Sequence, residues 1–214
     1  MDSVTGRRAD LALLIVTGAL HLLFENVFHL KGPFLAAATV VWTAWLARRF
    51  RREPGLLRAW GLDTAGFRPA FPAALVVTIL AAAALWILGS ALGNLPPPRG
   101  FLAVLVLYPL WALVQQVALN GILARGLLTL LPRPLVVPAA AVLFALAHAP
   151  DLRLMGLTLL GGLLWVALYL RRPNIWALVP CHALLGTLAY YGVLGRDPWS
   201  ELLVPLLSRL AGLP

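Results

Sequence analysis

The sequence is a succession of long apolar runs separated by short arginine clusters, and this pattern places the chain in a membrane. Hydrophobic residues make up 61% of its 214 residues and charged residues 12%, and the mean hydropathy is +0.89. Soluble domains do not have this composition. Since one helix needs about 20 apolar residues to cross a bilayer, we predict an all-α, polytopic membrane helix bundle with about eight transmembrane helices. We expect one integral-membrane domain, residues 1–214.

Turns rich in proline, glycine and arginine divide the apolar runs into predicted helices. Their expected ranges are 10–30, 34–47, 73–92, 101–131, 134–148, 154–170, 175–194 and 199–210. Residues 53–72 are too polar to span and are expected at the membrane interface as a short amphipathic segment. The first run follows Arg7 and Arg8 as in a signal peptide. It lacks a small-residue cleavage site, so we expect it to be retained as a helix.

The basic residues mark the orientation of the chain in the membrane. A net charge of +9 is also typical of nucleic-acid-binding proteins, but these arginines lie in short clusters between apolar runs, so no nucleic acid is expected. With both termini in the cytoplasm, 13 of the 17 basic residues lie on the cytoplasmic side, and the others are Lys31, Arg99, Arg153 and Arg196. We predict a multi-pass cell-membrane protein whose arginines meet the headgroups of the lipid bilayer.

The first predicted span carries three ionisable side chains at four-residue steps: His21, Glu25 and His29. At about 100° per residue they share one face of a helix. Glu25 is the only carboxylate inside a predicted span, and polar groups at membrane depth are expensive unless they are paired or functional. The sequence leaves two interpretations open, a functional site and an interhelical hydrogen-bond ladder.

Further polar side chains lie in the apolar runs of the second half. Gln116 and Asn120 are four residues apart and share a helix face, with Gln115 beside it. Amides can grip a peptide backbone or hold a histidine tautomer. His148 and His182 can act as a base, as metal ligands or as stabilisers of an oxyanion. The ligand types for a divalent metal such as zinc are present in His21, Glu25, His29, His148 and His182, although their spacing matches no recognised zinc motif.

Three segments of the second half resemble the motifs of one membrane-protein family. They are Gln115 to Gly121 (QQVALNG), Phe144 to His148 (FALAH) and His182 to Gly186 (HALLG), in this order. The chain resembles the CPBP family, which includes type II CAAX prenyl proteases and Abi-type proteins. The family motifs read Glu-Glu-x-x-x-Arg-Gly, then Phe-x-x-x-His, then His-x-x-x-Asn or a small residue. The resemblance covers about residues 113–186, within a family-like core of about residues 101–194.

This resemblance implies an endopeptidase whose first glutamate activates the attacking water, with both histidines helping and an asparagine aiding the oxyanion. The chain departs from it at Gln115 and Gln116, which replace the glutamates, and at Asn120 and Gly186, which replace the arginine and the asparagine. Both histidines are retained. A glutamine cannot act as a general base, and losing that contribution lowers a rate by about 10²–10⁴-fold.

Glu25 offers a replacement for the missing base. If the first helix faces His148 and His182, this carboxylate can take the place of the two glutamates, and the three amides can orient the substrate or the oxyanion. The hypothesis depends on a coincidence: the one carboxylate within a span occurs in a chain that lacks the two family glutamates.

Three functions follow as hypotheses. The first is an intramembrane endopeptidase that hydrolyses a peptide bond of a membrane-embedded peptide or a lipidated protein, with Glu25 in the role of the missing glutamates. The second is a catalytically inactive pseudoprotease that binds a membrane peptide in a regulatory or immunity role. The third is a small transporter or proton-relay protein, for which histidines and glutamates at membrane depth are also typical. The order of the three motifs argues against the third hypothesis.

Overall fold

The computed structural model describes residues 3–98 and 100–203, and within these ranges it contains helices and no strand. The predicted all-α membrane fold is confirmed. Five helices are long and apolar enough to cross a membrane: Val4–Asn26, Phe67–Ala91, Gly100–Leu127, Leu152–Arg171 and Ile175–Val193. The sequence predicts about eight, whereas the helices over 31–52 and 133–146 fall outside this set. The last predicted helix, 199–210, lies mostly outside the described residues.

The chain forms two compact units, each built from two stretches of sequence. Unit 1 is residues 1–67 and 116–176, and unit 2 is residues 68–115 and 177–214. Unit 1 holds α1 (Val4–Asn26), α2 (Lys31–Arg52), α3 (Leu56–Ala59), the π-helix η1 (Val117–Ala124), α6 (Arg125–Leu127), α7 (Arg133–Leu146) and α8 (Leu152–Arg171). Unit 2 holds α4 (Phe67–Ala91), α5 (Gly100–Gln116), α9 (Ile175–Leu188), and the π-helices η2 (Ala189–Val193) and η3 (Trp199–Leu203).

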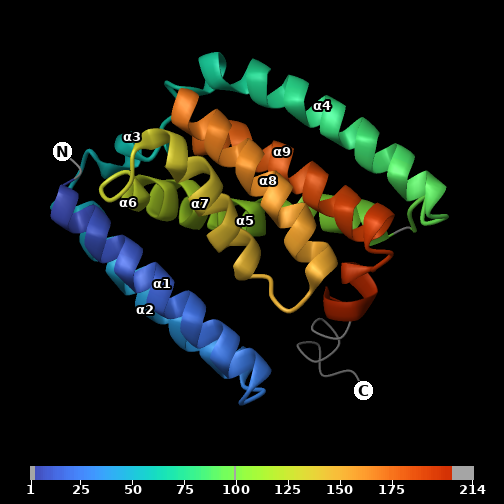
Figure 1. The fold of residues 1–214 in the computed structure, drawn as a ribbon, viewed down its shortest axis with the longest axis horizontal. Helices are drawn as coiled ribbons and strands as arrows, with labels where there is room; N and C mark the ends of the chain where they lie inside the picture. Colours follow the sequence, from blue (N-terminus) through green and yellow to red (C-terminus); the bar gives the residue numbers. More distant parts are fainter. Residues whose placement is uncertain (1–2, 99, 204–214) are drawn as a thin grey trace. The chain divides into compact units, whose positions relative to one another are not determined.

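Helices α1 and α2 form an antiparallel hairpin in unit 1 and lie side by side along their length (Figure 1). The Ser3 side chain accepts a hydrogen bond from the Gly6 N–H at 3.0 Å and caps α1. Further along, the Arg49 guanidinium donates to Asp10 Oδ2 at 3.1 Å, and Asp10 is only 1% exposed. This buried ion pair ties the two helices together near the N-terminus of α1.

The first helix ends earlier than the sequence predicts. It stops at Asn26, and α2 begins at Lys31, so the chain must reverse within four residues. His29 has a φ of 54° in this turn, which is a left-handed conformation that helps the reversal. The predicted stripe of three side chains therefore has two members on the helix, His21 and Glu25, and His29 is not one of them.

The segment predicted at the membrane interface is part of the core of unit 1. Leu56 and Trp60 are both 0% exposed and pack in a cluster with Ile122 of η1. The Tyr169 hydroxyl donates to the Trp60 carbonyl at 3.1 Å and connects α8 to this segment. The apolar side chains of this segment are therefore covered by protein, and its place at the membrane interface stays a prediction.

Helices α7 and α8 pack closely against each other and are joined by a short turn (Figure 1). The Asp151 side chain accepts from the Leu154 N–H at 3.1 Å and caps α8. His148 lies in the turn between the end of α7 and this cap. The turn thus fixes the backbone that carries one of the two motif histidines.

Candidate active site

Glu25 and His21 form a carboxylate–imidazole pair on α1. Glu25 Oε2 lies 3.0 Å from His21 Nε2, and both side chains are partly buried, at 30% and 24% exposure. Because an ionised carboxylate only accepts hydrogen bonds, His21 donates through Nε2 and the other nitrogen of the neutral ring keeps its lone pair. That atom, Nδ1, is buried and has no hydrogen-bond partner among the described residues. The pair is therefore a carboxylate-oriented imidazole with one free basic nitrogen.

The His21 ring is held in place by α2. It lies against the ring of Phe34, with 5.8 Å between the centroids, and Phe34 stacks on Phe24 at 5.3 Å. These contacts restrict the rotation of the imidazole. The sequence predicts the shared face of His21 and Glu25, and the structure adds the aromatic support.

His148 follows α7 and is held in one orientation. Its Nδ1 lies 2.8 Å from the Phe144 carbonyl oxygen, and its ring makes a T-shaped contact with the Phe144 ring at 5.0 Å. A carbonyl only accepts, so Nδ1 carries the proton and Nε2 is the acceptor in the neutral ring. The backbone carbonyl and the ring of Phe144 therefore both hold the His148 ring in its orientation.

His148 also interacts electrostatically with α1. Burial lowers the pKa of His148, and the charge of His21 acts in the same direction, while the Phe144 carbonyl and Asp151 oppose them. His21 thus lies near enough to His148 for their charges to interact. Glu25 pairs with His21 on α1, whereas the convergence of Glu25 with His148 that the sequence analysis raises stays a prediction.

Gln116 and Asn120 form a buried amide pair. Asn120 Nδ2 donates to Gln116 Oε1 at 2.6 Å, and both residues are 0% exposed. Asn120 lies within the π-helix η1, a rare conformation that is frequent at functional sites. Its Oδ1 has no hydrogen-bond partner in the described part of the chain. A buried acceptor of this kind is expensive unless a bound group or water satisfies it.

A second unsatisfied polar atom belongs to a residue that packs beside this part of η1. Trp60 Nε1 is buried without a hydrogen-bond partner among residues 3–98 and 100–203. The Trp60 ring packs on Gly121, the residue after Asn120, where an added Cβ would lie 2.9 Å from the ring. Unit 1 therefore has one orphan donor and one orphan acceptor in the same region. A peptide group, which has one donor and one acceptor, matches them in kind.

Unit 2 contains His182, Gln115 and a tyrosine that the sequence analysis missed. His182 is 7% exposed, and the ring of Tyr108 lies beside it with 6.1 Å between the centroids. A Cβ atom on Gly186 would lie 2.8 Å from the Tyr108 hydroxyl oxygen. Tyr108 thus fills the space in front of the position where the family motif has asparagine. Gln115 Oε1 is buried without a hydrogen-bond partner in the described residues.

The metal-site prediction gains no support from the geometry. Among the described residues, no group of three or more His, Cys, Asp or Glu side chains could hold a metal ion. His29 is exposed in the turn after α1, away from the helical pair of His21 and Glu25.

A signal for Tyr108 was present in the sequence. Gly186 replaces a larger side chain of the family motif, and a vacated volume in a packed helix bundle must be filled from a facing helix. No sequence pattern indicated the π-helix η1 or the burial of Trp60, because the residues around both are uniformly apolar.

The comparisons with known proteins agree with the motif resemblance. Residues 97–188 match the model of the family described as type II CAAX prenyl endopeptidase Rce1-like. A search of curated proteins and a search of solved structures give no match. The five apolar helices and the family match together make this chain a multi-pass membrane protein. Over residues 97–188, the chain is similar to this family of membrane endopeptidases, which agrees with the resemblance that its three motifs predict.

Proposed function

We propose that this chain is an active endopeptidase that cleaves a membrane-associated peptide, and that Glu25 replaces the two family glutamates by acting through His21. The observation that carries the proposal is the His21–Glu25 pair at 3.0 Å, whose buried His21 Nδ1 has no hydrogen-bond partner among the described residues. This arrangement follows the logic of a catalytic triad, in which a carboxylate orients an imidazole that acts as the base.

The proposed reaction begins with a water molecule between His21 and the substrate. His21 Nδ1 takes a proton from the water, and the water oxygen attacks the carbonyl carbon of the scissile peptide bond. Glu25 stabilises the imidazolium that forms. The carbonyl electron pair moves to its oxygen and returns as the C–N bond breaks, and His21 gives its proton to the leaving amine. The products are one carboxylic acid and one amine.

His148 acts as the positioning group in this scheme. Its Nδ1 bond to Phe144 leaves Nε2 as an acceptor, which can hold the second hydrogen of the attacking water. Asn120 Oδ1, which has no hydrogen-bond partner among the described residues, is the amide atom left to accept from a peptide N–H in this scheme. No step requires a metal.

The test uses the full chain in nanodiscs and two internally quenched peptide probes. One probe ends in a farnesylated Cys-aliphatic-aliphatic-X sequence, after the description of the matched family, and the other carries a hydrophobic helix instead of the lipid. The proposal expects cleavage of at least one probe, with oxygen from labelled water in the new carboxyl group. His148→Gln should slow cleavage at least tenfold. Asp63→Asn is the matched control, because Asp63 pairs with Arg58, which is 83% exposed.

The second candidate function is peptide binding without cleavage. It is favoured by the unsatisfied Asn120 Oδ1 and Trp60 Nε1, an acceptor and a donor that bound peptide groups can satisfy. In the same experiment, this pseudoprotease would bind a probe and leave it intact over hours. That result would reject the endopeptidase proposal.

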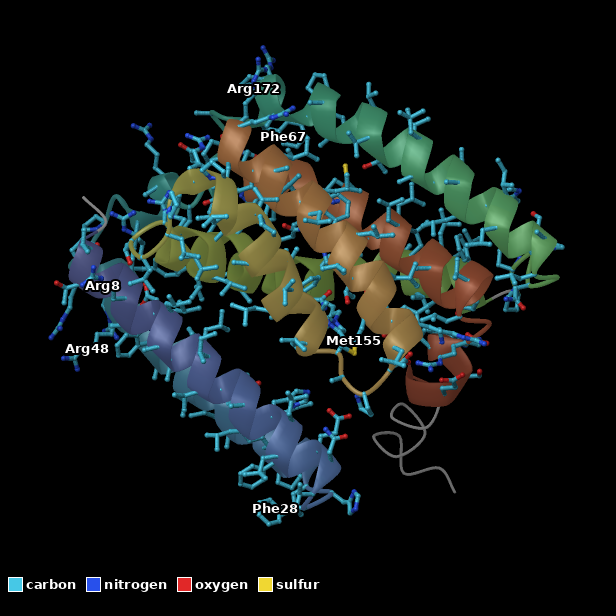
Figure 2. The ribbon with its side chains drawn as sticks, in the orientation of Figure 1. Arg8, Phe28, Arg48, Phe67, Met155 and Arg172 are labelled. Carbon is cyan, nitrogen blue, oxygen red and sulfur yellow. The ribbon has the colours of Figure 1, made fainter. Side chains whose placement is uncertain are left out.

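We also propose that both termini lie in the cytoplasm, which requires an even number of crossings and therefore that α2 crosses in addition to the five long apolar helices. The proposal is supported by the sequence bias of the basic residues and by the hairpin geometry. Figure 2 shows Arg8 and Arg48 at one end of the α1–α2 hairpin and Phe28 at the other. Labelling of cysteines introduced at Ser3 and at Asn26 with an impermeant reagent in whole cells tests it. Only the Asn26→Cys variant should react from outside.

A further inference from the structure

The four arginines that end α2 differ in what they contact. Arg49 is 7% exposed and binds Asp10 and Glu53, so its charge is used inside the protein. Arg48 and Arg52 are exposed, and neither side chain has a hydrogen-bond or ion-pair partner in the part of the chain that the structure describes. The positive-inside rule is the alternative explanation for these arginines, and it requires only their positive charge. It does not explain why the unpaired arginines line one groove.

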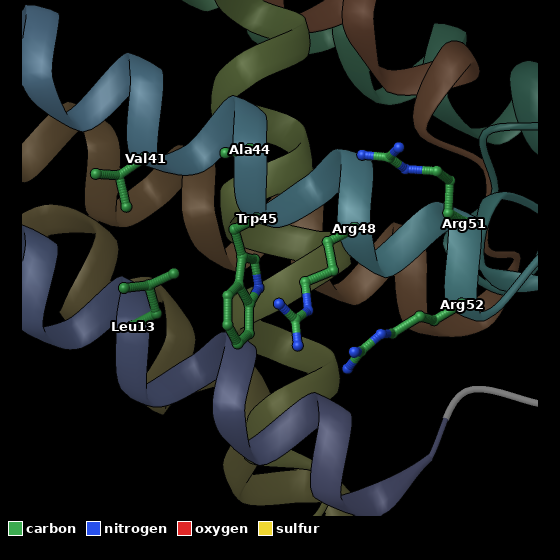
Figure 3. Close-up of a pocket in the computed structure, with 7 residues that line it drawn as sticks. All are labelled: Leu13, Val41, Ala44, Trp45, Arg48, Arg51 and Arg52. Carbon is green, nitrogen blue, oxygen red and sulfur yellow. The ribbon is translucent and has the colours of Figure 1, made fainter.

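The groove lies between α1 and α2 and has a volume of about 650 Å³ (Figure 3). Its apolar part is formed by Leu13 of α1 and by Val41 and Ala44 of α2. Its basic part is formed by Arg48, Arg51 and Arg52, and Trp45 lies between the two parts. In Figure 3, Trp45, Arg48 and Arg52 extend from α2 to the same side, while Arg51 extends away from them.

The helical spacing of the residues on α2 explains why one part of the groove is apolar and the other basic. Val41, Ala44, Arg48 and Arg52 are separated by three or four residues and therefore follow one face of α2. The face changes from apolar to basic toward the C-terminal end of the helix. Trp45 is fixed at the change, because its Nε1 donates to Asp10 Oδ1 at 2.7 Å. An amphipathic tryptophan at this level is typical of the boundary between hydrocarbon and headgroups.

We propose that this groove is a binding site for one anionic phospholipid. The lipid phosphate binds Arg48 and Arg52, with Arg51 at the edge, and an acyl chain lies along Leu13, Val41 and Ala44. Charge complementarity argues for this occupant, because the two unpaired guanidinium groups have no carboxylate in the groove to neutralise them. The order of apolar and basic residues matches a phospholipid and does not match a free anion, which would need no apolar face. A hydrophobic peptide would leave the arginines unpaired.

The bound lipid also connects the two helices of the hairpin. Leu13 belongs to the helix that carries His21 and Glu25, and the arginines belong to α2, which holds the His21 ring through Phe34. The site is distinct from the proposed active site, so each can be tested without the other.

The experiment measures lipid retention by native mass spectrometry of the full chain released from mixed micelles. The probes are phosphatidylglycerol and phosphatidylcholine with identical acyl chains. The unmodified chain should retain one phosphatidylglycerol in preference to phosphatidylcholine. Removing both unpaired charges in Arg48→Gln/Arg52→Gln should weaken phosphatidylglycerol binding about tenfold or more. The matched control is Arg153→Gln/Arg171→Gln, which removes the same charge from exposed residues of α8 and should change binding less than about twofold.

A third variant tests the apolar part of the groove without changing the charge. Ala44→Trp fills the groove and should weaken phosphatidylglycerol binding while the arginines stay in place. This variant also keeps the test valid if the arginine variant does not fold. An equal loss in both arginine pairs would show a general charge effect and overturn the site. An unchanged affinity in Ala44→Trp, or complete displacement of the lipid by inorganic phosphate, would overturn it as well.

Discussion

Asn120 Nδ2 donates to Gln116 Oε1 at 2.6 Å, and neither residue is exposed. These are the positions where the related family has an arginine and a glutamate. In this chain the two positions contact each other through two neutral groups. A neutral pair avoids the desolvation penalty of a buried ion pair. It also leaves the helix without a base.

Gln116 and Asn120 should stabilise the fold as a hydrogen-bonded pair. Gln116→Met removes the acceptor of the Asn120 amide and leaves a buried donor unsatisfied, which costs about 1–3 kcal/mol. Adding Asn120→Leu removes that donor too, so the double variant should recover part of the loss. Thermal unfolding in one detergent measures both. A double variant that is less stable than the sum of the single changes would contradict the pairing.

Gly186 should not accept the asparagine of the family motif. Its Cβ position lies 2.8 Å from Tyr108 atoms, so Gly186→Asn overpacks unit 2 and should lower the free energy of unfolding by about 1–3 kcal/mol. Tyr108→Ala in the same chain should restore much of the loss, since it vacates the clashing volume. Urea unfolding compares the three variants. A fully stable Gly186→Asn variant would show that Tyr108 does not occupy this space.

The ion pair between α1 and α2 should be structural. Asp10→Asn leaves the buried Arg49 without its principal partner, and breaking such a pair costs about 3–5 kcal/mol. Asp63→Asn, which removes the partner of an exposed arginine, should cost less than about 1 kcal/mol. Thermal unfolding of both variants in the same detergent checks the difference, and equal midpoints would contradict the burial of Asp10.

The pKa of His148 should depend on the charges of the residues around it. Burial lowers it, so the neutral imidazole, the form able to accept a hydrogen bond, persists to a lower pH than for a free histidine at about 6.5. His21→Gln removes a like charge and should raise the pKa. Asp151→Asn removes a carboxylate and should lower it, while still capping α8. Titration of His148 by NMR gives all three values. Shifts in the same direction in both variants would place His148 in another environment.

Hydropathy predicted the order of the main helices better than the number of spans or the helix ends. The last span agrees within one residue, 175–194 against 175–193, because polar residues bound it on both sides. The first helix starts six residues earlier than predicted, at Val4. Its first two turns follow the Ser3 cap and contain charged residues such as Arg7, so hydropathy does not assign them to the apolar span. Trp60 was placed at the interface because its burial depends on distant residues of η1.

The candidate site was predictable where it depends on local spacing. The four-residue steps of His21 and Glu25, and of Gln116 and Asn120, predict two side-chain pairs, and both form. The interaction between His21 and His148 was a hypothesis from the sequence, because contacts between helices depend on tertiary packing. Tyr108 was missed because its significance depends on the glycine that faces it.

The cleavage rate of Glu25→Gln is the most direct test of the account, measured on the probe that the unmodified chain cuts. The variant keeps a hydrogen-bond acceptor for His21 but loses the negative charge that stabilises the imidazolium. The rate should fall by about 10²–10⁴-fold. The cleavage rate of His21→Gln should fall similarly. The double variant should be no slower than the slower single variant, because the two residues act as a unit. An unchanged rate in Glu25→Gln would show that the base lies elsewhere and would contradict the central claim.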